Sequence, residues 1–564
     1  MGPIAVTAVY LGLALWVTWS WWMPLGGRLT AVDQPDAVLF SWLLSWTPQA
    51  LSEHQVPLYA PALNAPNGIN LMWNNGMALP GLLFAPVTAA LGGLATLTVV
   101  IAVGLAGSAI TAFAALRALG AGLLPAALGG KVFGFSPAIV AQSLGHPDLV
   151  FDVLAPVLVL LAVRLAVLDR PRWRTAVLLG LLAAMQLLIG EELLFDTGIV
   201  VALILAVLAV SHPRRTLRRA PRFLALAGVA LGVFAVLGGP LLAFQLLGPL
   251  PQTGSPFTVG YFGVDLANHV VPSGQQLLAP DAAVARAQRF PGGAEERGGF
   301  LGWPLVAMAV VALLLLGRRE RVRVPLLVAV VVATLAMGEQ LRIDGRSTGL
   351  ALPWAWLVGL PGFEHAIPNR LALFTAGLVG AGLAFALTAL RETPRTTRAV
   401  ATAIAVITLV PLVPASLPAV DAPAVPAFFT SPDAQLCPGG SVLVLPFPAP
   451  DATTPMLWQA ASGMAFAMPG GYFIGPADNG HAYVGGQPTQ TGALLRAVAA
   501  DGHVRPPTPE IEAAFRSDVR YWRACAAVLG PAPHADALRA QAEALTGRLP
   551  ESVDGVLLWR DLGR

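Results

Sequence analysis

A polar stretch follows the first apolar segment of the chain, and the rest of the sequence is understood from it: Arg28-Leu-Thr-Ala-Val-Asp-Gln-Pro-Asp-Ala-Val-Leu-Phe-Ser-Trp-Leu-Leu-Ser-Trp46. The stretch puts two carboxylates, Asp33 and Asp36, just after a segment of membrane-spanning length. Trp42 and Trp46 have the spacing of neighbours on one helix face, and tryptophan is enriched at membrane interfaces. The pattern predicts a site at a membrane surface, with an ordinary polar loop and an aromatic belt as the alternative.

The composition is that of a membrane protein. Of the 564 residues, 56% are hydrophobic and 12% are charged, and the mean hydropathy is +0.69. Such a chain cannot bury its apolar surface in a soluble core, so we expect a polytopic α-helical membrane protein. The net charge of +3 is small, and the basic residues are spread over short loops, so nucleic acid is not an expected partner. Eleven apolar runs are long enough to be transmembrane helices, near residues 4–23, 95–116, 121–142, 148–168, 175–190, 194–210, 223–247, 300–316, 324–338, 370–390 and 399–417.

The basic residues between these runs predict the orientation of the chain in the plasma membrane. They form four clusters, which the positive-inside rule assigns to the cytoplasm, at 170–174, 214–222, 318–323 and 391–398. A further apolar run, residues 78–92, has 15 residues. It reaches only about 22 Å as a helix, short of the ~30 Å hydrocarbon core, and it contains Pro80 and Pro86. Counting runs back from the cytoplasmic cluster 170–174 decides its place: if 78–92 crossed the membrane, the loop of Asp33 and Asp36 would be cytoplasmic, so we expect 78–92 along the interface. The N-terminus is then cytoplasmic, and residues 24–94 form a large external loop.

The composition changes after the last apolar run. Residues 418–564 begin with a proline-rich linker and continue with strand-like runs and glycine-rich turns. We therefore expect a transmembrane domain over residues 1–417 and an extracytoplasmic α/β domain over 418–564. The expected strands lie at 441–446, 519–522 and 555–559. Both cysteines of the chain, Cys437 and Cys525, fall in this domain, where they can form a disulfide in an oxidising compartment or remain two buried thiols.

Polar residues in the first two external segments are candidates for chemistry. Asp33 and Asp36 can act as a general base toward a hydroxyl or bind a hard divalent metal. A solvated loop acid or a helix cap is the alternative for both. His146 and Asp148 lie in a short turn between two apolar runs, where capping of the following helix is again the alternative.

Two further sets of polar residues are predicted on the same face. Glu191 and Glu192 lie at another short external turn, where hydration of a hairpin tip is the alternative. Arg370 leads into a membrane helix and can bind a phosphate, with His365 as a second donor, unless Arg370 only extends its charge to the interface. The sequence contains no Walker loop, dinucleotide fingerprint or cysteine metal motif. The long external loop 248–299 adds weaker candidates for substrate contacts: Asp265, His269 and Glu296.

The layout resembles the GT-C class of polyprenyl-phosphate-dependent glycosyltransferases. It shares an acid-bearing first external loop, a second acid at the next external turn, an arginine in a late external loop and a soluble domain after the last helix. Short segments are similar to actinobacterial membrane proteins of this type: Asp36 to Trp46, Asn64 to Trp73, Phe133 to Pro137, Gly145 to His146, and Pro368 to Arg370.

The resemblance implies roles for the candidate residues. Asp36 or Asp33 falls at the catalytic acid of the first loop, Asp148 at the second acid, and Arg370 at the contact to the lipid phosphate. The paired acids of the class are separated here as Asp-Gln-Pro-Asp, which leaves the choice between Asp33 and Asp36 open. The sequence also leaves open whether Asp36 and Asp148 bind a divalent metal ion.

The implied reaction is an inverting transfer. A sugar would pass from a polyprenyl-phosphate-linked donor to an extracytoplasmic glycan, lipid or protein acceptor. Two other hypotheses remain: a transporter of lipid or polysaccharide, which would carry polar residues at mid-membrane depth, and a non-catalytic scaffold for envelope assembly.

Overall fold

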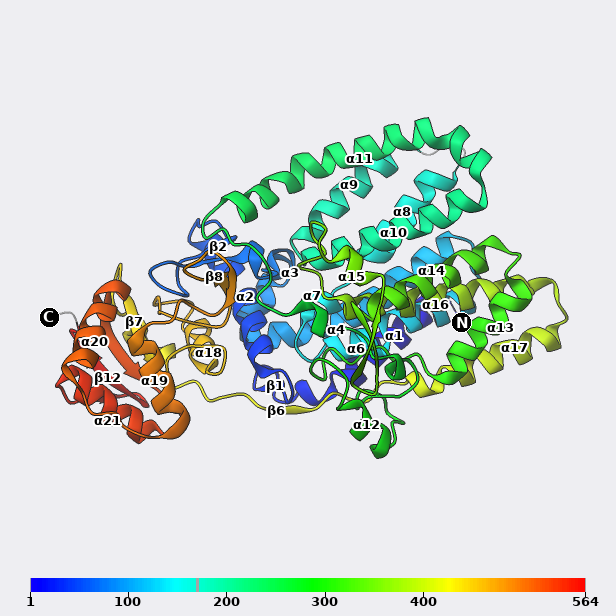
Figure 1. The fold of residues 1–564 in the computed structure, drawn as a ribbon. Coiled ribbons are helices and arrows are strands. Elements are labelled where there is room, and N and C mark those ends of the chain that lie inside the picture. The colour runs from blue at the N-terminus through cyan, green and yellow to red at the C-terminus, as the bar shows by residue number, and fades with distance from the viewer. Residues whose placement is uncertain (1, 169–171, 563–564) are drawn as a thin grey trace.

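The computed structural model describes residues 2–168 and 172–562, so Arg170 of the first basic cluster lies outside the described residues. The chain forms a helical bundle with a small sheet-containing unit at its C-terminal end (Figure 1). Six segments of the described chain are long and apolar enough to cross a membrane: α4 (Ala85–Ala118), Leu123–Gln142, α10 (Glu191–Ser211), α11 (Pro213–Leu247), Pro368–Glu392 and Arg395–Leu412. Shorter apolar helices accompany them: α1 (Pro3–Val17), α8 (Ala155–Val167), α9 (Trp173–Leu187) and α13 (Trp303–Leu316). The helix after α13 is α14 (Glu320–Ala336).

The helices differ from the eleven expected runs because local breaks interrupt several of them. The run 121–142 is divided into α5 (Leu123–Gly134) and α6 (Pro137–Gln142), where Ser136 caps the second helix by accepting from the backbone N–H of Ile139. The run 148–168 is divided into α7 (Pro147–Val150) and α8. Each break leaves polar side chains at a helix end, so the breaks create the places where a site can form.

Residues 78–92 are helical. They form α3 (Ala78–Leu83) and the first turns of α4, which bends at Gly92, where φ is +80°. The basic cluster 214–222 is also helical, because α11 begins at Pro213 and arginine is a good helix former. The predicted loop is thus the first part of a 35-residue helix.

The tryptophan pair of the first loop is not a membrane belt. Trp42 and Trp46 lie on α2 (Gln34–Ser52), are 0% and 2% exposed, and stack with ring centroids 5.9 Å apart. The indole N–H of Trp42 donates to Gln459 Oε1 at 2.7 Å, on α18 (Thr454–Ala461). The rings are buried because α2 packs between the bundle and the C-terminal part of the chain, which the local pattern could not reveal.

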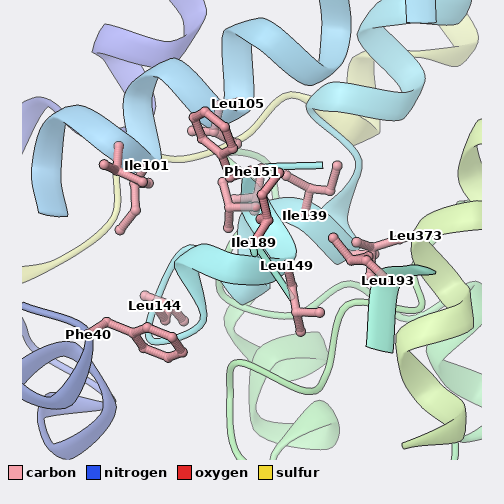
Figure 2. Close-up of a cluster of buried hydrophobic side chains, with 14 of the residues drawn as sticks. Phe40, Ile101, Leu105, Ile139, Leu144, Leu149, Phe151, Ile189, Leu193 and Leu373 are labelled. Atoms are coloured by element: carbon pink, nitrogen blue, oxygen red, sulfur yellow. The ribbon is translucent and has the colours of Figure 1, made fainter. Parts of the chain in front are cut away.

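A buried apolar cluster packs helix α2 against the helices of the bundle. Figure 2 shows side chains from α2, α4, α6, α7, α10 and α16 (Ala372–Ala389) meeting at one place. Phe40 of α2 and Leu149 of α7 belong to it, as does Leu373 of α16. Burial of each such side chain contributes about 1.5–3 kcal/mol, so this cluster fixes the breaks described above relative to the first loop.

The C-terminal sheet has four strands in the order β11-β12-β10-β7. The strands are β7 (Ser441–Leu445), β10 (Ala524–Leu529), β11 (Glu551–Val553) and β12 (Val556–Arg560), and helices α19 (Gln490–Asp501), α20 (Pro509–Trp522) and α21 (Ala535–Thr546) accompany them. Only β7 and β10 are parallel neighbours. The strand expected at 519–522 is wrong: these residues end α20, where Phe515, Val519 and Trp522 are buried at helical spacing.

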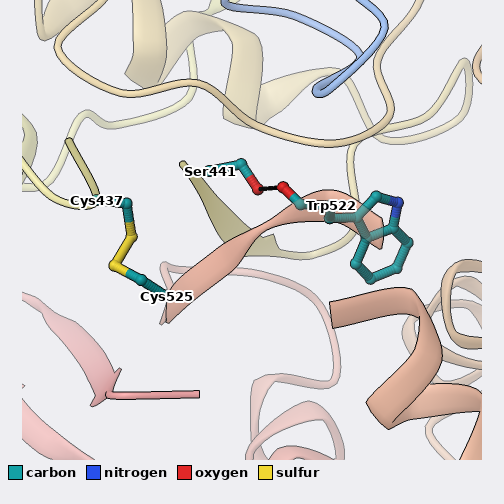
Figure 3. The surroundings of a disulfide bond; sticks show 4 residues. All are labelled: Cys437, Ser441, Trp522 and Cys525. Carbon is teal, nitrogen blue, oxygen red and sulfur yellow. Dashed lines mark hydrogen bonds between the residues drawn. A yellow bond between two sulfur atoms is a disulfide. The ribbon is translucent and has the colours of Figure 1, made fainter. Parts of the chain in front are cut away.

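A disulfide joins Cys437 to Cys525, with the Cα atoms 5.6 Å apart (Figure 3). Nearby, Ser441 Oγ donates to the carbonyl of Trp522 at 2.6 Å. Both contacts link the start of β7 to the segment that enters β10, so they fix the parallel pair at one end.

The first loop and the C-terminal part are also joined through backbone pairing. β1 (Arg28–Thr30) pairs antiparallel with β6 (Ala419–Asp421). The remaining short elements are β2 (Tyr59–Ala60), β3 (Ile69–Asn70), α12 (Asp281–Ala287), β4 (Gln340–Ile343), β5 (Arg346–Ala351), α15 (Trp354–Leu357), α17 (Arg395–Thr408), β8 (Ile474–Pro476) and β9 (Ala482–Val484).

Candidate functional site

Three predicted residues from two distant segments meet in one cluster, the acid cluster. Ligand atoms of Asp33, Asp36 and His146 all lie within 4.8 Å of one another. Asp33 is the N-cap of α2 and accepts from the backbone N–H of Asp36 at 3.5 Å, which puts Asp36 in the first turn of that helix. His146 comes directly before α7. The capping alternative is therefore realised by Asp33, while Asp36 is free to point at the histidine.

Asp36 is held by two donors. Its Oδ2 is 2.8 Å from His146 Nε2, and its Oδ1 accepts a hydrogen bond from the hydroxyl of Tyr472. Burial opposes the charged form, but the hydrogen bond and the charge of His146 keep the pKa of Asp36 below its usual range. Burial likewise favours a neutral ring at His146, yet the hydrogen bond and charge of Asp36 raise the pKa of His146 to about 10. The two groups form an ion pair at neutral pH.

Asp33 has different electrostatics from Asp36. Burial, followed by the charge of Asp36, raises the pKa of Asp33 to about 8. A Cβ atom added at Gly145 would lie 2.5 Å from Asp33 Oδ2, so glycine is the residue that lets the carboxylate approach this turn. Asp36 is thus ionised and held by two donors, whereas Asp33 takes up a proton near pH 8.

A chain of polar contacts leads from His146 into the bundle. His146 Nδ1 is 2.6 Å from Gln142 Oε1, and Gln142 Nε2 donates to Glu296 Oε2 at 2.9 Å. Glu296 Oε1 then pairs with the guanidinium of Arg370 at 3.1 Å, and the same guanidinium pairs with Glu192. This polar network connects the acid cluster to residues of the 248–299 loop, α10 and the segment before α16.

Arg370 is enclosed by carboxylates. It is 8% exposed, and its two ion pairs with Glu192 and Glu296 are supported by further bonds. Asn369 donates to Glu296 Oε2 at 3.0 Å, and the backbone N–H of Ile367 donates to Glu192 Oε1 at 2.7 Å. The positive charge is therefore compensated within the protein. The phosphate contact predicted for Arg370 stays a prediction.

Asp148 lies beside the network but outside the acid cluster. Asn75 Nδ2 donates to Asp148 Oδ2 at 3.0 Å, and burial raises the pKa of Asp148 to about 6. Among the described residues, the group that could hold a metal ion consists of Asp33, Asp36 and His146 and does not include Asp148. Asp152, just beyond α7, is fully buried, and neither of its carboxylate oxygens has a hydrogen-bond partner in the described part of the chain.

The weaker candidates have other partners. Asp265 accepts from three backbone N–H groups, those of Ala267, Asp344 and Gly345, and so stabilises a turn. His269 Nδ1 lies 3.0 Å from the carbonyl oxygen of Gly299. Asp265 and His269 thus have structural contacts of their own.

Glu191 and His365 are the remaining predicted residues, and their surroundings differ. Glu191 accepts from Gln245 Nε2 at 2.7 Å. His365 is partly exposed, lies 3.4 Å from Glu364 and has its ring 6.0 Å from that of Trp73. Among the contacts of the described residues His365 has none with Arg370, so the second phosphate donor stays a prediction as well.

Sequence reasoning missed two residues of the site. Gln142 precedes His146 by four positions, and this helical spacing is the signal that could have found it. Tyr472 bonds to a partner 436 positions away, so no local pattern could have found it. Its loop follows Gly470 and Gly471, both with positive φ, which lets the chain turn there.

The donor set suits a divalent metal ion. Two carboxylates and one imidazole are within reach of a common point, and Gln142 fixes the orientation of the ring by taking the hydrogen of His146 Nδ1. Asp33, Asp36 and His146 Nε2 would then be the ligands, since oxygen and imidazole donors suit metals such as Mn²⁺.

Comparison with known proteins assigns the sequence to a family. Residues 9–363, more than half of the chain, match the family described as "Domain of unknown function (DUF6311)". The chain belongs to this family. No curated protein matches the sequence.

Solved structures similar to this DUF6311 chain are membrane glycosyltransferases. The arabinofuranosyltransferase AftD from Mycobacteria has a TM-score of 0.58 and 14% identity, and the match covers 99% of this chain and 40% of that one. The oligosaccharyltransferase AglB from Archaeoglobus fulgidus, solved with an inhibitory peptide and a dolichol-phosphate, has a TM-score of 0.47 and 12% identity, with 94% and 69% covered. The chain spans less than half the length of AftD. The resemblance to GT-C membrane glycosyltransferases is confirmed at the level of the fold.

Proposed function

We propose that the protein is an inverting membrane glycosyltransferase that uses a polyprenyl-phosphate sugar and an extracytoplasmic acceptor. The observation that carries the proposal is the acid cluster of Asp33, Asp36 and His146 in a fold similar to that of AftD. AglB has been solved with a dolichol-phosphate, which supports a lipid-linked donor. The acceptor is a hydroxyl-bearing glycan, lipid or protein.

Asp33 is the general base. A base is most effective when its pKa is close to the working pH, and the pKa of Asp33 is raised to about 8 by burial and by Asp36. Asp36 is a poor base because Tyr472 and His146 already donate to both of its oxygens. The sequence leaves open whether Asp33 or Asp36 is the base, and this difference supports Asp33.

The transfer then proceeds in one displacement. Asp33 accepts the proton of the acceptor hydroxyl as the hydroxyl oxygen forms a bond to the anomeric carbon. The bond from that carbon to the phosphate oxygen breaks on the opposite face, and the electron pair leaves on the polyprenyl phosphate. The anomeric centre is inverted, and the products are the glycosylated acceptor, polyprenyl phosphate and protonated Asp33.

Positive charge near the acids stabilises the departing phosphate. The His146 ring is charged at neutral pH, and Asp36 and Gln142 hold it in place. A divalent ion on Asp33, Asp36 and His146 would displace the Nε2 proton of the ring, and it would supply a Lewis acid in place of the imidazolium charge. Arg370 acts as a positioning residue, because it fixes Glu296 and through it Gln142.

The test is transfer from polyprenyl-phosphate sugars by purified variants. Asp33→Asn keeps the shape of the base but removes its ability to accept a proton, so turnover is expected to fall by about 10²- to 10⁴-fold while donor binding is retained. Asp36→Asn is expected to be the milder change in turnover. The control is Asp433→Asn, an exposed acid of the C-terminal part, which leaves both unchanged.

Two outcomes count against the proposal. Wild-type turnover in both single variants and in the double variant would exclude the acid cluster from catalysis and favour a transporter or scaffold. A greater loss for Asp36→Asn would keep the class of reaction but make Asp36 the base.

A further inference from the structure

A small cavity lies where the first external loop meets the C-terminal part of the chain. Its volume is about 100 Å³. β3 of the first loop contacts β8, and β2 lies beside β8 in Figure 1. We call this space the loop cavity. Its lining residues come from five segments: 64–67 of the first loop, 447–450 after β7, 470–471, 483–496 from β9 into α19, and 521–522 at the end of α20.

The loop cavity adjoins the acid cluster through a single loop. Gly470 and Gly471 line the cavity, and the next residue, Tyr472, donates its hydroxyl hydrogen to Asp36. Consecutive Cα atoms are about 3.8 Å apart, so the backbone of one cavity wall also carries the side chain that reaches the acids. The backbone N–H of Asn64 donates to the carbonyl of Gly470 at 3.0 Å and fixes this wall to the first loop. A long molecule that extends from the cavity along the loop would approach Asp36.

The lining combines ring faces with neutral polar groups. Phe447 and Trp522 are buried with their ring centroids 5.5 Å apart, whereas Tyr483 is 39% exposed. The side chains of Tyr483 and Gln487 make no hydrogen bond to the part of the chain that the structure describes, so both are available to a ligand. Arg496 carries the charge of the described lining and pairs with Asp451 at 3.0 Å, so an anionic group is not favoured.

Glycine and proline set the backbone of the cavity wall. Gly470, Gly471 and Gly485 all have positive φ, and a glycine lets a ligand approach the main chain closely. An extended peptide would need a free strand edge with N–H donors. The rim instead carries prolines, which have no N–H, and β9 already pairs with β8. These prolines are Pro448, Pro450 and Pro488. The wall therefore suits a ring with hydroxyl groups better than a peptide backbone.

The size of the cavity limits what it can enclose. About 100 Å³ is well below the roughly 300–1,000 Å³ of sites that enclose a drug-sized ligand. It suits one unit of a longer chain whose other units stay in solvent. A sugar unit has a face of C–H groups, which packs on an aromatic ring, and a rim of hydroxyls, which bond to amide and backbone groups.

We propose that the loop cavity binds one unit of a neutral saccharide, which is the acceptor glycan of the transfer. The role of acceptor rests on the proposed function. The sugar ring packs on Tyr483, its hydroxyls bond to the amide of Gln487 and to the bare backbone at Gly470 and Gly471, and the glycan extends past Tyr472 to bring its terminal hydroxyl to Asp33.

The test is binding of the purified full chain to an array of neutral pentose and hexose oligosaccharides of increasing length, printed beside serine- and threonine-rich peptides. The wild-type protein is expected to bind saccharides and not peptides. Ala493→Trp puts a large ring at an exposed lining position of α19 and is expected to weaken binding by about tenfold or more. The matched control is Ala500→Trp, at an exposed position two turns further along α19 that does not line the cavity, and it is expected to bind as the wild type does.

A second pair of variants examines the ring itself. Tyr483→Ala removes the ring and is expected to weaken saccharide binding by about tenfold, whereas Tyr483→Phe keeps the ring face and retains most of the binding. Thermal unfolding of each variant identifies a misfolded protein.

Three results would overturn the proposal. Wild-type protein that binds no saccharide on the array would remove the site, and binding of peptides alone would make it a peptide site. Equal saccharide binding by Ala493→Trp and the wild type would place the saccharide elsewhere.

The outcome is separable from that of the proposed function. Asp33→Asn is expected to bind saccharides as the wild type does, because Asp33 does not line the cavity. Saccharide binding by a protein that transfers no polyprenyl-linked sugar would keep the saccharide site and end the proposed function. Transfer to a lipid or protein acceptor without saccharide binding would do the reverse.

Discussion

The polar network around Arg370 and the basic cluster 214–222 at the start of α11 place positive charge in opposite surroundings. In the network Arg370 contacts two carboxylates, and His146 contacts Asp36. In the basic cluster, Arg214, Arg215 and Arg218 are exposed to solvent. Burying a charge is costly unless it is paired. Paired charges inside a protein therefore fix positions, whereas exposed charges are solvated and need no such partner.

The largest effect is expected from removing the central charge of the network. Arg370→Ala leaves Glu192 and Glu296 buried without their partner, and breaking a buried pair costs about 3–5 kcal/mol. Thermal unfolding in detergent measures the loss.

The control for this prediction is a compensated variant. Adding Glu192→Gln and Glu296→Gln to Arg370→Ala removes the unpaired charges and is expected to recover much of the stability. A single Arg370→Ala variant that unfolds at the wild-type temperature would show that the ion pairs contribute nothing, and would revive a direct phosphate role.

A smaller effect is expected at the link between the C-terminal part and the acid cluster. Tyr472→Phe removes the hydroxyl that donates to Asp36 Oδ1, and a hydrogen bond to a charged group contributes about 1.5–3 kcal/mol. Losing a donor also raises the pKa of Asp36, so the variant shifts the pH profile of transfer as well as the unfolding temperature. Tyr521→Phe, which loses a bond to the neutral Asn67, is the matched control and leaves the pH profile unchanged. An identical profile for both variants would disconnect Tyr472 from the cluster.

A further effect is a pH dependence of stability. The pKa of Asp33 is raised from 3.8 to about 8, so the folded state keeps a proton that the unfolded chain loses across that range. The pKa of His146 is raised from 6.5 to about 10, with the same consequence at higher pH. A folded state that binds more protons loses stability as pH rises, so both groups act in the same direction between pH 6.5 and 8.

Unfolding temperatures measured from pH 5 to 10 check this sign. Asp33→Asn is expected to flatten the curve below about pH 6.5 and leave the decline due to His146 above it. A stability that rises from pH 7 to 9 would contradict the assignment of protons to the cluster.

Much of the candidate site could be predicted because its residues follow local rules. Asp33 and Asp36 stand at the start of a helix, and His146 lies at a turn between apolar runs; the structure brings these three together. The partners of Arg370 could not be predicted, because Glu192 and Glu296 lie 178 and 74 positions away in the chain. Such separations leave no periodic trace in the sequence.

The sequence by itself determined that the chain is a helical membrane protein, that strands lie near residues 441–446 and 555–559, and that Asp33 and Asp36 stand at a helix start. These properties depend on hydropathy and on neighbours a few positions apart. Tertiary structure alone decided that Trp42 and Trp46 are buried, that residues 519–522 are helical, and that Arg370 is enclosed by carboxylates. It also decided that α11 packs chiefly against α9. These outcomes depend on which distant surfaces exclude water and share charge, and that is a property of the packed chain and not of any segment within it.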